Sequence, residues 1–393
     1  MTDRWSSRES ASAASGEFGT AERRALREVV RRFVERDVAP HLDGWERAGE
    51  VPRDAHLRAG ELGLLGAGYP EPAGGSGGDL IDSLVVAEEL IVSGGSSGLV
   101  AALFTHGIAL PHILAAGDPD QVERFARPAL AGRAIGALGV TEPDTGSDVA
   151  SLRTTARRDG DWFRVNGSKT YITSGARADF VTTAVRTGGP GHAGISLLVV
   201  ERGTAGFTVT RRLEKMGWHC SDTAELSFVD CMVPAANLVG GQDEGFAQIM
   251  RQFQSERISL ATQAYATAQR CLDLTVFWVR ERHTFGRPLS SRQVVRHRLA
   301  EMATRVEVAR TFTRAVACRL ARGEDVVTEV SMAKNVATAA CAEVVDAAVQ
   351  LHGGAGYLRD SEVERHYRDS RILSIGGGTT EIMNELIARR MSL

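Results

Sequence analysis

The segment VTEPDTGSD at 140–148 has residue types that could hold a polar, phosphate-bearing ligand. Its proline and glycine are typical of a turn. In such a turn the backbone amides and hydroxyls of Val140, Thr141 and Ser147 could contact a flat polar ring and a phosphate group. Taken alone, the segment fits an ordinary turn rich in Gly and Asp better than a ligand site.

The segment NGSKTYITSG at 166–175 is typical of a turn followed by a strand. Side chains two residues apart in a strand point to the same face, so Tyr171 and Thr173 would share one face. There the aromatic ring could stack on a planar cofactor while the hydroxyl hydrogen-bonds to it. Taken alone, this segment fits an ordinary half-buried strand better than a cofactor site.

Two glycine-rich segments near the end of the chain frame another candidate site. QLHGGAG at 350–356 closes an apolar helical pattern, where glycine lets the backbone leave the helix. SIGGGTTEI at 374–382 leads into the last predicted helix, whose N-terminus can hold an anionic or carbonyl oxygen. RERHTFGRPLSSRQ at 280–293 precedes them in the chain. The two glycine-rich bends also fit simple loop punctuation.

Helical patterns surround a β-rich middle. From about residue 21 to 134, and again from 246 onward, apolar residues recur at three- and four-residue steps, which indicates helices. Between 135 and 240, short β-branched and aromatic runs bounded by Gly, Asp, Asn and Pro indicate strands. The predicted strands are 162–167, 195–202, 207–213 and 224–233, and the predicted C-terminal helices are 246–282, 291–322, 326–351 and 380–391.

These patterns predict a flexible tail at 1–19, an N-terminal helical domain at 20–135, a middle β domain at 136–245 and a C-terminal helical domain at 246–393. The helix predicted at 326–351 is apolar on nearly every face. Such a helix is typical of the inside of a bundle or of a subunit interface. The tail is rich in Ser and Ala and lacks the apolar segment of a signal peptide.

The composition is that of an ordinary globular protein, with 43% hydrophobic and 24% charged residues. A net charge of −3 excludes a bulk basic field, and no nucleic-acid-binding motif is present, so we expect no nucleic-acid partner. Only three of the 46 Lys and Arg residues are lysines, Lys169, Lys215 and Lys334, which we attribute to a GC-rich genome. Five dispersed cysteines without a C-x-x-C pair favour reduced thiols, so we expect no metal and a cytoplasmic location.

One uncharged stretch, residues 98–117, is about as long as a membrane span. It contains His106, Pro111 and His112 and lies between acidic segments. A buried pair of helices therefore fits it better than a membrane anchor, and we expect no membrane insertion.

In this order, VTEPDTGSD, YIT, RHTFGRPLSSRQ, QLHGGAGY and GGTTEI resemble the motifs of the acyl-CoA dehydrogenase family, over essentially the whole chain from about residue 20. LEKMGWHCSDTAELSFVDCMVP at 213–234 resembles the family's second β-domain signature. The resemblance implies an α+β fold with an N-terminal helical domain, a middle β-barrel-like domain and a C-terminal four-helix bundle. It also implies FAD as cofactor, acyl-CoA as substrate, electron-transferring flavoprotein as electron acceptor and a homotetramer.

Matched position by position, the resemblance implies which residues bind FAD. Those of one subunit would be Leu138, Val140, Thr141, Ser147, Tyr171, Ile172 and Thr173. Across a subunit interface, FAD would be bound by Arg282, Phe285 and Gln293, and reached by Gln350, Leu351, His352, Gly353 and Gly354. Further FAD contacts would be Thr379, Thr380 and Glu381, and the substrate contacts would be Ser147, Gln254, Ser255, Arg257, Gly377 and Gly378.

Most members of the family carry the catalytic glutamate at the position of Gly377, and glycine cannot accept a proton. The isovaleryl-CoA and long-chain acyl-CoA dehydrogenases share this glycine and carry the glutamate on an earlier helix, just before an arginine. Glu256-Arg257 matches that pair, so the resemblance implies Glu256 as the base and a place in this branch. A solvated helix glutamate is the alternative interpretation of Glu256. Ala247 stands where the long-chain branch has a bulky tyrosine that contacts substrate, so we expect a different pocket shape, and a branched, short or carrier-protein-bound acyl group stays open as substrate.

The expected reaction is α,β-dehydrogenation of a saturated acyl-CoA to the trans-2-enoyl thioester. Because the α-hydrogen is a weak acid, the thioester carbonyl must accept hydrogen bonds, for which the N–H of Gly377 and the flavin ribityl hydroxyl are the candidates. Desolvation would raise the pKa of Glu256 toward the working pH. Glu256 then removes the α-proton while flavin N5 takes a hydride from the β-carbon.

Three other functions stay open at this point. The thioester carrier could be an acyl carrier protein of a secondary-metabolite pathway instead of CoA. An acyl-CoA oxidase or flavin monooxygenase on the same fold would pass its electrons to oxygen, and no residue decides this because oxygen access depends on cavity geometry. A non-catalytic flavin- or acyl-CoA-binding protein is favoured by Gly377 and opposed by Glu256.

Overall fold

The computed structural model describes residues 16–393, which form two compact units that interleave along the chain. We call them the helical unit and the sheet unit. The helical unit comprises the residues up to Asp43, Asp79–Val100 and Arg257–Leu393. The sheet unit comprises Gly44–Gly78 and Ala101–Glu256.

Three helices contain residues of both units. They are α2 (Leu42–Ala48), α5 (Ser97–Leu103) and the long α9 (Gly245–Glu281). The two compact units thus divide the chain differently from the domains predicted at 20–135, 136–245 and 246–393. The predicted domain boundaries stay a prediction.

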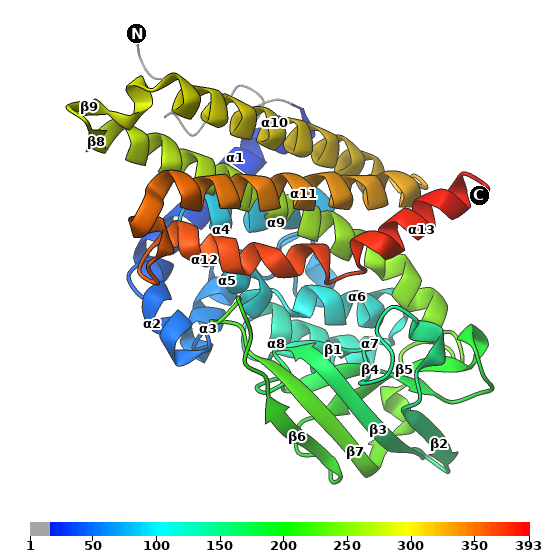
Figure 1. Ribbon diagram of the computed structural model, residues 1–393. Coiled ribbons are helices and arrows are strands. Elements are labelled where there is room, and N and C mark those ends of the chain that lie inside the picture. Colours follow the sequence, from blue (N-terminus) through cyan, green and yellow to red (C-terminus); the bar gives the residue numbers. More distant parts are fainter. Residues whose placement is uncertain (1–15) are drawn as a thin grey trace. The chain divides into compact units, whose positions relative to one another are not determined.

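The helical unit is organised around α11 (Val327–His352). Its other helices and its hairpin are α1 (Ala21–Phe33), α4 (Leu80–Val92), α10 (Gln293–Ala321), α12 (Glu362–Ser370), α13 (Thr380–Arg390), β8 (His283–Thr284) and β9 (Arg287–Pro288). α10 runs along α11, and α12 and α13 also pack on α11 (Figure 1). α1 packs against α4.

The helices predicted near the C-terminus correspond to α9, α10, α11 and α13, with ends that differ by at most two residues. The helix α12 was not among them. Its sequence EVERHYRDS is strongly polar, yet Val363, His366 and Asp369 are buried on one side of it. Because two of these three buried residues are polar, the sequence of α12 has no apolar periodicity from which a helix could be predicted.

The flexible tail predicted at 1–19 includes residues 16–19, which the structure describes. Residues 1–15 lie outside the described part of the chain, but Glu17–Gly19 forms a 3-10 turn. Phe18 is buried in one hydrophobic cluster with Ile81, Leu84 and Val316. The tail prediction is therefore wrong for these residues, because burial of a large aromatic side chain stabilises their position.

Glu88 on α4 is the centre of a buried ionic cluster in the helical unit. Its carboxylate accepts hydrogen bonds from Arg27 (3.2 Å), Arg314 (2.5 Å) and the hydroxyl of Tyr265 (3.1 Å). Burial alone would raise the pKa of Glu88, but the charges of Arg314 and Arg27 outweigh it and hold this pKa at about 2. Glu88 thus pairs with two buried guanidinium groups, and Arg27 also pairs with the buried Glu89 at 2.9 Å.

The sheet unit contains one curled sheet of seven strands (Figure 1). The strands are β1 (Gly136–Gly139), β2 (Thr155–Asp159), β3 (Trp162–Thr173), β4 (Phe180–Arg186), β5 (Ile195–Glu201), β6 (Phe207–Arg212) and β7 (Thr223–Pro234). Their order is β1-β4-β2-β3-β7-β6, with β5 paired to β4. β4 runs parallel to β1 and β2, and the other pairs are antiparallel. The helices of this unit are α3 (Arg53–Glu61), α6 (His106–Ala116), α7 (Pro119–Gln121) and α8 (Arg127–Leu130).

The strand β4 is buried on both faces of the sheet. Phe180 and Ala184 belong to the hydrophobic cluster that includes residues of α6 and α8. Val181 and Val185 belong to a second cluster with β3 and β7. The same two-sided burial of β5 explains why its sequence ISLLVVE is continuously apolar.

The turn predicted at Asn166-Gly167 is wrong, because β3 continues through it to Thr173. The register of β3 against β7 shifts between Val165 and Gly167, and again between Lys169 and Ile172. Gly167 has φ 148°, and a Cβ there would lie 2.5 Å from Thr154 Oγ1. The glycine therefore marks a β-bulge and not a chain reversal.

The uncharged stretch at 98–117 forms most of α5 and α6. Across residues 16–393, no single helix is both long and apolar enough to cross a bilayer, and α5 and α6 meet that test only as a pair bent by 41°. Leu110 and Ile113 of α6 are buried in the cluster with β4 and β5.

The ionic cluster around Glu88 makes a prediction about stability. Glu88→Ala leaves Arg27 and Arg314 buried without this carboxylate, and we expect the free energy of unfolding to fall by about 3–5 kcal/mol. Urea denaturation followed by circular dichroism measures the change. The matched control is Glu28→Ala, since Glu28 is exposed and lies 3.6 Å from Arg31 and Arg32. Its effect should stay below about 0.5 kcal/mol, and equal losses in both variants would contradict the prediction.

Two buried histidines predict an acid-sensitive sheet unit. Burial lowers the pKa of His56 and of His106 to about 4, from an ordinary 6.5. The unfolded chain therefore binds more protons than the folded one between pH 6.5 and pH 4, so stability is present above this range and is lost as pH falls through it. We expect a loss of the order of 3 kcal/mol per histidine, seen as a falling urea midpoint.

The matched variant for this prediction is His56→Gln combined with His106→Gln. Nε2 of His56 lies 3.1 Å from Ala102 O and Nε2 of His106 lies 2.9 Å from Leu65 O, and glutamine can donate to these carbonyls without titrating. The double variant should lose less stability between pH 6.5 and pH 4 than the wild type. An unchanged pH slope would show that other groups govern acid unfolding.

Candidate active site

In the sheet unit, the first candidate segment begins where β1 ends. Its turn is closed by a bridge between Glu142 and Thr145. Thr170 N donates to Thr141 O at 2.9 Å, so β3 lies directly beside this segment. Of the predicted ligand-binding residues here, Val140 is buried, Leu138 and Thr141 are half-buried and Ser147 is exposed.

Glu142 and Lys169 form a buried ion pair that ties these segments together. Lys169 Nζ lies 2.7 Å from Glu142 Oε1 and donates to Val140 O at 3.1 Å. The Glu142 carboxylate also accepts the N–H groups of Arg153 (2.6 Å) and Thr154 (2.9 Å). Burial lowers the pKa of Lys169 to about 8, although the charge of Glu142 acts in the opposite direction. Burial would raise the pKa of Glu142, but the charge and hydrogen bond of Lys169 outweigh it and lower this pKa. Both groups are therefore charged at neutral pH.

The YIT segment ends β3 with an unusual backbone. Tyr171 has φ 59°, in the left-handed region, and its side chain is 69% exposed. Ile172 is buried and Thr173 half-buried, so Tyr171 and Thr173 are both on the more open side. The left-handed backbone of Tyr171 interrupts the strand alternation from which a shared face with Thr173 was predicted, so that juxtaposition stays a prediction. The second bulge of β3 precedes this change, and Lys169 and Thr170 before it are both buried.

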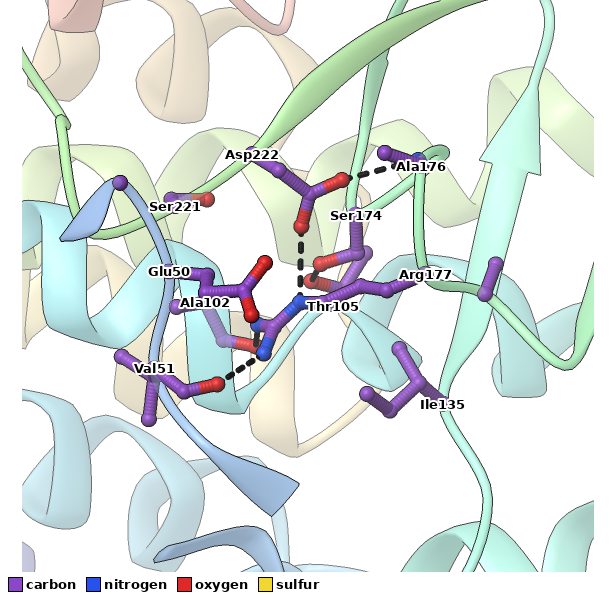
Figure 2. Close-up of polar contacts among 12 residues, drawn as sticks. Glu50, Val51, Ala102, Thr105, Ile135, Ser174, Ala176, Arg177, Ser221 and Asp222 are labelled. Carbon is purple, nitrogen blue, oxygen red and sulfur yellow. Dashed lines mark hydrogen bonds and ion pairs between the residues drawn. The ribbon is translucent and has the colours of Figure 1, made fainter. Parts of the chain in front are cut away.

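The turn that follows the YIT segment is held by the buried carboxylate of Asp222. Ala176 N donates to Asp222 Oδ2 at 2.8 Å and Arg177 Nε to Oδ1 at 2.7 Å (Figure 2). Arg177 also donates to Val51 O and, at 3.3 Å, to Ala102 O. The carboxylate and guanidinium thus satisfy main-chain groups from several separate segments of the sheet unit.

Ser174, the first residue of this turn, also has a left-handed backbone, with φ 57°. Its Oγ lies 2.7 Å from Thr105 Oγ1, and Figure 2 shows the two side chains beside the Arg177 guanidinium. The sequence analysis missed this network. Arg177 and Asp222 are 45 residues apart, and no local pattern links them.

In the helical unit, two cations hold the glycine-rich segment before α13. Arg257 Nε donates to Gly377 O at 3.1 Å, and Lys334 Nζ donates to Gly378 O. Gly377 has φ 64° and Gly378 has φ 101°, which other residues rarely adopt. A Cβ on Gly378 would lie 2.7 Å from Met383 Cε. The segment is therefore fixed by its carbonyls, and a larger residue at 378 would be strained by the positive φ.

The helix α13 begins directly after these glycines. Thr379 is its N-cap, and its hydroxyl accepts the N–H of Ile382 at 3.3 Å. Glu381 is exposed in the first turn, where hydrogen bonds to its own N–H and to Thr379 lower its pKa. Thr380 is half-buried beside it. The end of the segment thus offers the N–H groups of a helix start.

The second group of predicted cofactor residues lies around the β8–β9 hairpin. Phe285 at the hairpin tip is 97% exposed with φ 51°, and Arg282 and Gln293 on either side are exposed. The ring of His352 stacks on Trp278 of α9, with centroids 5.0 Å apart. In the rest of the predicted 350–354 set, Gln350, Gly353 and Gly354 are exposed and Leu351 is half-buried.

The two groups of the helical unit are far apart. Lys334, which contacts Gly378, and His352 are 18 residues apart on the same straight helix, a rise of about 27 Å. Figure 1 accordingly shows the β8–β9 hairpin and α13 at different ends of α11. One cofactor ring therefore cannot contact both groups of the same subunit. This agrees with the resemblance, which implies that the hairpin contacts the FAD of a neighbouring subunit.

Glu256, the predicted base, is half-buried on α9. It directly precedes Arg257, whose guanidinium is bonded to the carbonyl of Gly377. Gln254 and Ser255 are also half-buried, and Ser255 Oγ donates to Gln252 O of the same helix at 2.8 Å. The helix therefore carries the carboxylate next to the residue that anchors the glycine-rich segment.

The residues present fit a flavin. Tyr171 and Phe285 are large exposed aromatic residues held at left-handed backbone positions, where exposure of a ring needs a reason. Thr145 Oγ1, in the 140–148 segment, is buried and has no hydrogen-bond partner in the described part of the chain. Groups of His, Cys, Asp and Glu able to hold a metal ion were not found among residues 16–393.

Comparison with known proteins identifies the family. Models of the acyl-CoA dehydrogenase N-terminal, middle and C-terminal domains match residues 20–133, 137–231 and 243–392. A solved structure of a probable acyl CoA dehydrogenase from Mycobacterium abscessus is 65% identical with a TM-score of 0.94, covering 95% of this chain and 99% of that one. The long-chain specific acyl-CoA dehydrogenase of Mus musculus is 39% identical over 381 residues, 95% of this chain and 87% of that protein. A probable acyl-CoA dehydrogenase of Bacillus subtilis is 37% identical over 374 residues, 95% of this chain and 98% of its own length.

These matches confirm the resemblance and the α+β fold inferred from the motifs. Together the three domain models extend over nearly all of the described chain, and the relatives are matched over most of their own length. The chain therefore belongs to the acyl-CoA dehydrogenase family, on a long-chain-like branch, and is a flavin-dependent oxidoreductase.

Proposed function

We propose that this protein oxidises the Cα–Cβ bond of a saturated acyl-CoA to the trans-2-enoyl thioester, with Glu256 as the base that removes the α-proton. The observation that carries the proposal is the hydrogen bond from Arg257 to Gly377 O, which joins the helix of Glu256 to the glycine-rich segment. Gly377 stands where most of the family has its glutamate, so a base must come from elsewhere in the chain. Glu256 is the acid next to that connection.

The glycine-rich segment supplies the other half of the chemistry. Its carbonyls at 377 and 378 are occupied by Arg257 and Lys334, while the start of α13 offers N–H donors. We infer that the N–H of Gly377 donates to the thioester oxygen, where negative charge develops as the α-proton leaves. Removal of water around Glu256 by the acyl chain would raise its pKa toward neutrality.

FAD, when bound, supplies the hydride acceptor for the β-carbon. We propose that the segments 138–147 and 171–173 hold its ring system in one subunit. Arg282, Phe285, Gln293 and the segment 350–354 would contact the FAD of a neighbouring subunit in a homotetramer. His352 of this group is about 27 Å along α11 from Lys334, which contacts the glycine-rich segment. Electron-transferring flavoprotein is the proposed acceptor of the electrons.

A long acyl chain is the proposed substrate class. The Mus musculus relative is named as long-chain specific, and this chain shares with that branch both Gly377 and the Glu256-Arg257 pair. Ala247, exposed near the start of α9, replaces a bulky residue of that branch and would leave more room for the acyl chain of the substrate.

The function is tested by mixing the FAD-loaded protein anaerobically with a panel of saturated acyl-CoAs, from short and branched to long. Bleaching of the flavin absorption by the long-chain members supports the proposal. Bleaching by none, with FAD bound, would contradict it. Rapid recovery of the colour in air after bleaching would identify an oxidase instead of a dehydrogenase.

Glu256→Gln tests the base directly. Glutamine keeps the size and polarity of the side chain but cannot accept the proton, so flavin reduction by the best acyl-CoA should slow by roughly 10²–10⁴-fold. FAD content and acyl-CoA affinity should stay near the wild-type values. The matched control is Glu281→Gln, at the exposed end of the same helix, which should reduce its flavin at the normal rate. Normal reduction in Glu256→Gln would assign the base to another acid.

Phe285→Ala tests the role of the hairpin. Because the side chain is 97% exposed, its removal should leave the thermal midpoint of the apoprotein unchanged. If Phe285 contacts a neighbouring subunit's FAD, the dissociation constant for FAD should rise about tenfold, as measured by flavin fluorescence. Val308→Ala, at an exposed position of α10, is the control. Equal FAD affinity in both variants would remove the hairpin from the site.

A further inference from the structure

The three lysines of the chain share one kind of contact. Lys169 and Lys334 are 0% and 1% exposed, and Lys215 is half-buried. Each donates to a main-chain carbonyl: Lys169 to Val140 O, Lys215 to Ser221 O and Lys334 to Gly378 O. All other cations among the 46 Lys and Arg residues are arginine. Lysine is therefore kept only where it binds the backbone.

A physical difference between the two side chains explains this pattern. On the surface, arginine replaces lysine at little cost because both charged groups reach water. A buried guanidinium is larger and has five donors to satisfy, whereas an ammonium is compact and has three. Lys169 is 0% exposed, and its ammonium is bonded to Glu142 Oε1 and Val140 O. A guanidinium at this position would have five donors to satisfy in the same buried surroundings.

Lys169 is bonded to one particular peptide group. Its Nζ contacts Val140 O, which belongs to the peptide that joins Val140 to Thr141. No cis peptide bond occurs in the described residues, and in a trans peptide the C=O and N–H point in opposite directions. The N–H of Thr141 therefore points away from Lys169, and Thr141 itself is half-buried. The cation fixes the orientation of this peptide from its buried side.

We propose that Lys169 is a positioning residue for the flavin, holding the Val140–Thr141 peptide so that the N–H of Thr141 donates to the cofactor ring. The inference rests on the proposed FAD site at 138–147. A positive charge on the carbonyl side polarises the peptide and makes its N–H a stronger donor. A ring that gains electrons accepts such a hydrogen bond more strongly, so Lys169 raises the reduction potential of bound FAD.

Glu142 is part of the same device and acts in the opposite sense. Its carboxylate lies 2.7 Å from Lys169 Nζ and is fixed by the N–H groups of Arg153 and Thr154. It keeps the ammonium in place while partly cancelling its charge. The proposal therefore predicts a sign for each partner: loss of Lys169 lowers the flavin potential, and neutralisation of Glu142 raises it.

Lys334 provides an independent case of the same contact in the helical unit. It donates to Gly378 O while Arg257 donates to Gly377 O, so two successive peptides are oriented by cations. Both belong to the segment proposed to bind the thioester. That a buried lysine binds a carbonyl in each of these two proposed ligand-binding segments argues that orientation of their peptides is the role that retains lysine.

The test measures FAD affinity and flavin potential in Lys169→Met, Glu142→Gln and the double variant. Affinity is measured by titrating the apoprotein with FAD, and potential by equilibration with a reference dye. We expect the double variant to raise the FAD dissociation constant about tenfold and to lower the potential by about 30 mV, a tenfold change in the two-electron equilibrium. The flavin potential of Lys169→Met alone should be lower than that of the double variant, and the potential of Glu142→Gln should be higher than that of the wild type.

The order of potentials separates positioning from a merely structural role. If Lys169→Met does not fold, the order of potentials is still given by Glu142→Gln and the double variant. The double variant leaves no buried charge in the pair. Lys215→Met is the matched control and should keep both wild-type values, since its carbonyl partner lies in the 213–222 loop. Equal potentials across the set would overturn the proposal.

Failure of the proposed function gives a different result. If the wild type binds no FAD, or binds FAD that no acyl-CoA reduces, the proposed activity fails before any variant is compared. If the wild type passes both tests and the variants fold but match its FAD affinity and potential, only the role of Lys169 is wrong. Circular dichroism of each variant establishes that it has folded.

Discussion

Buried main-chain groups in irregular segments need partners, and this constraint shapes the candidate site. Helices and strands satisfy their own N–H and C=O groups, but loops do not. In this protein the partners are charged side chains: Glu142 and Asp222 accept N–H groups, while Lys169 and Arg257 bind carbonyls. Each costs free energy to bury and is tolerated because it is paired. The main chain of the loops bound in this way is therefore fixed by charged side chains.

Such rigidity allows strained backbone at the site. Tyr171, Ser174 and Phe285 all have positive φ without being glycine, and the turn after Tyr171 is secured by Asp222. Each such residue costs of the order of 1 kcal/mol or more and persists only where its surroundings enforce it. The strain leaves the Tyr171 ring exposed at the end of a strand whose other residues are mostly covered. In the proposed function that ring has a ligand to contact.

The sequence predicted most of the fold and the members of the site, but not what holds them. Helices such as α11 were predicted to within one residue of their ends because apolar periodicity is a local signal. The bulge at Gly167 was mistaken for a turn, since Asn-Gly favours both and only the pairing of β3 with β7 decides. The bond between Arg177 and Asp222 joins positions 45 residues apart. No periodicity encodes a contact of that kind, so it had to be seen in the fold.

Composition held more information than the sequence analysis took from it. The scarcity of lysine was attributed to base composition, which accounts for the arginines but not for the three exceptions. A bias toward arginine acts wherever the two cations are interchangeable, so the remaining lysines mark positions where they are not. Two of the three are buried, and each of these two binds a carbonyl of a proposed ligand-binding loop. In a chain with such a bias, the rare residue of a pair is a better guide to function than the common one.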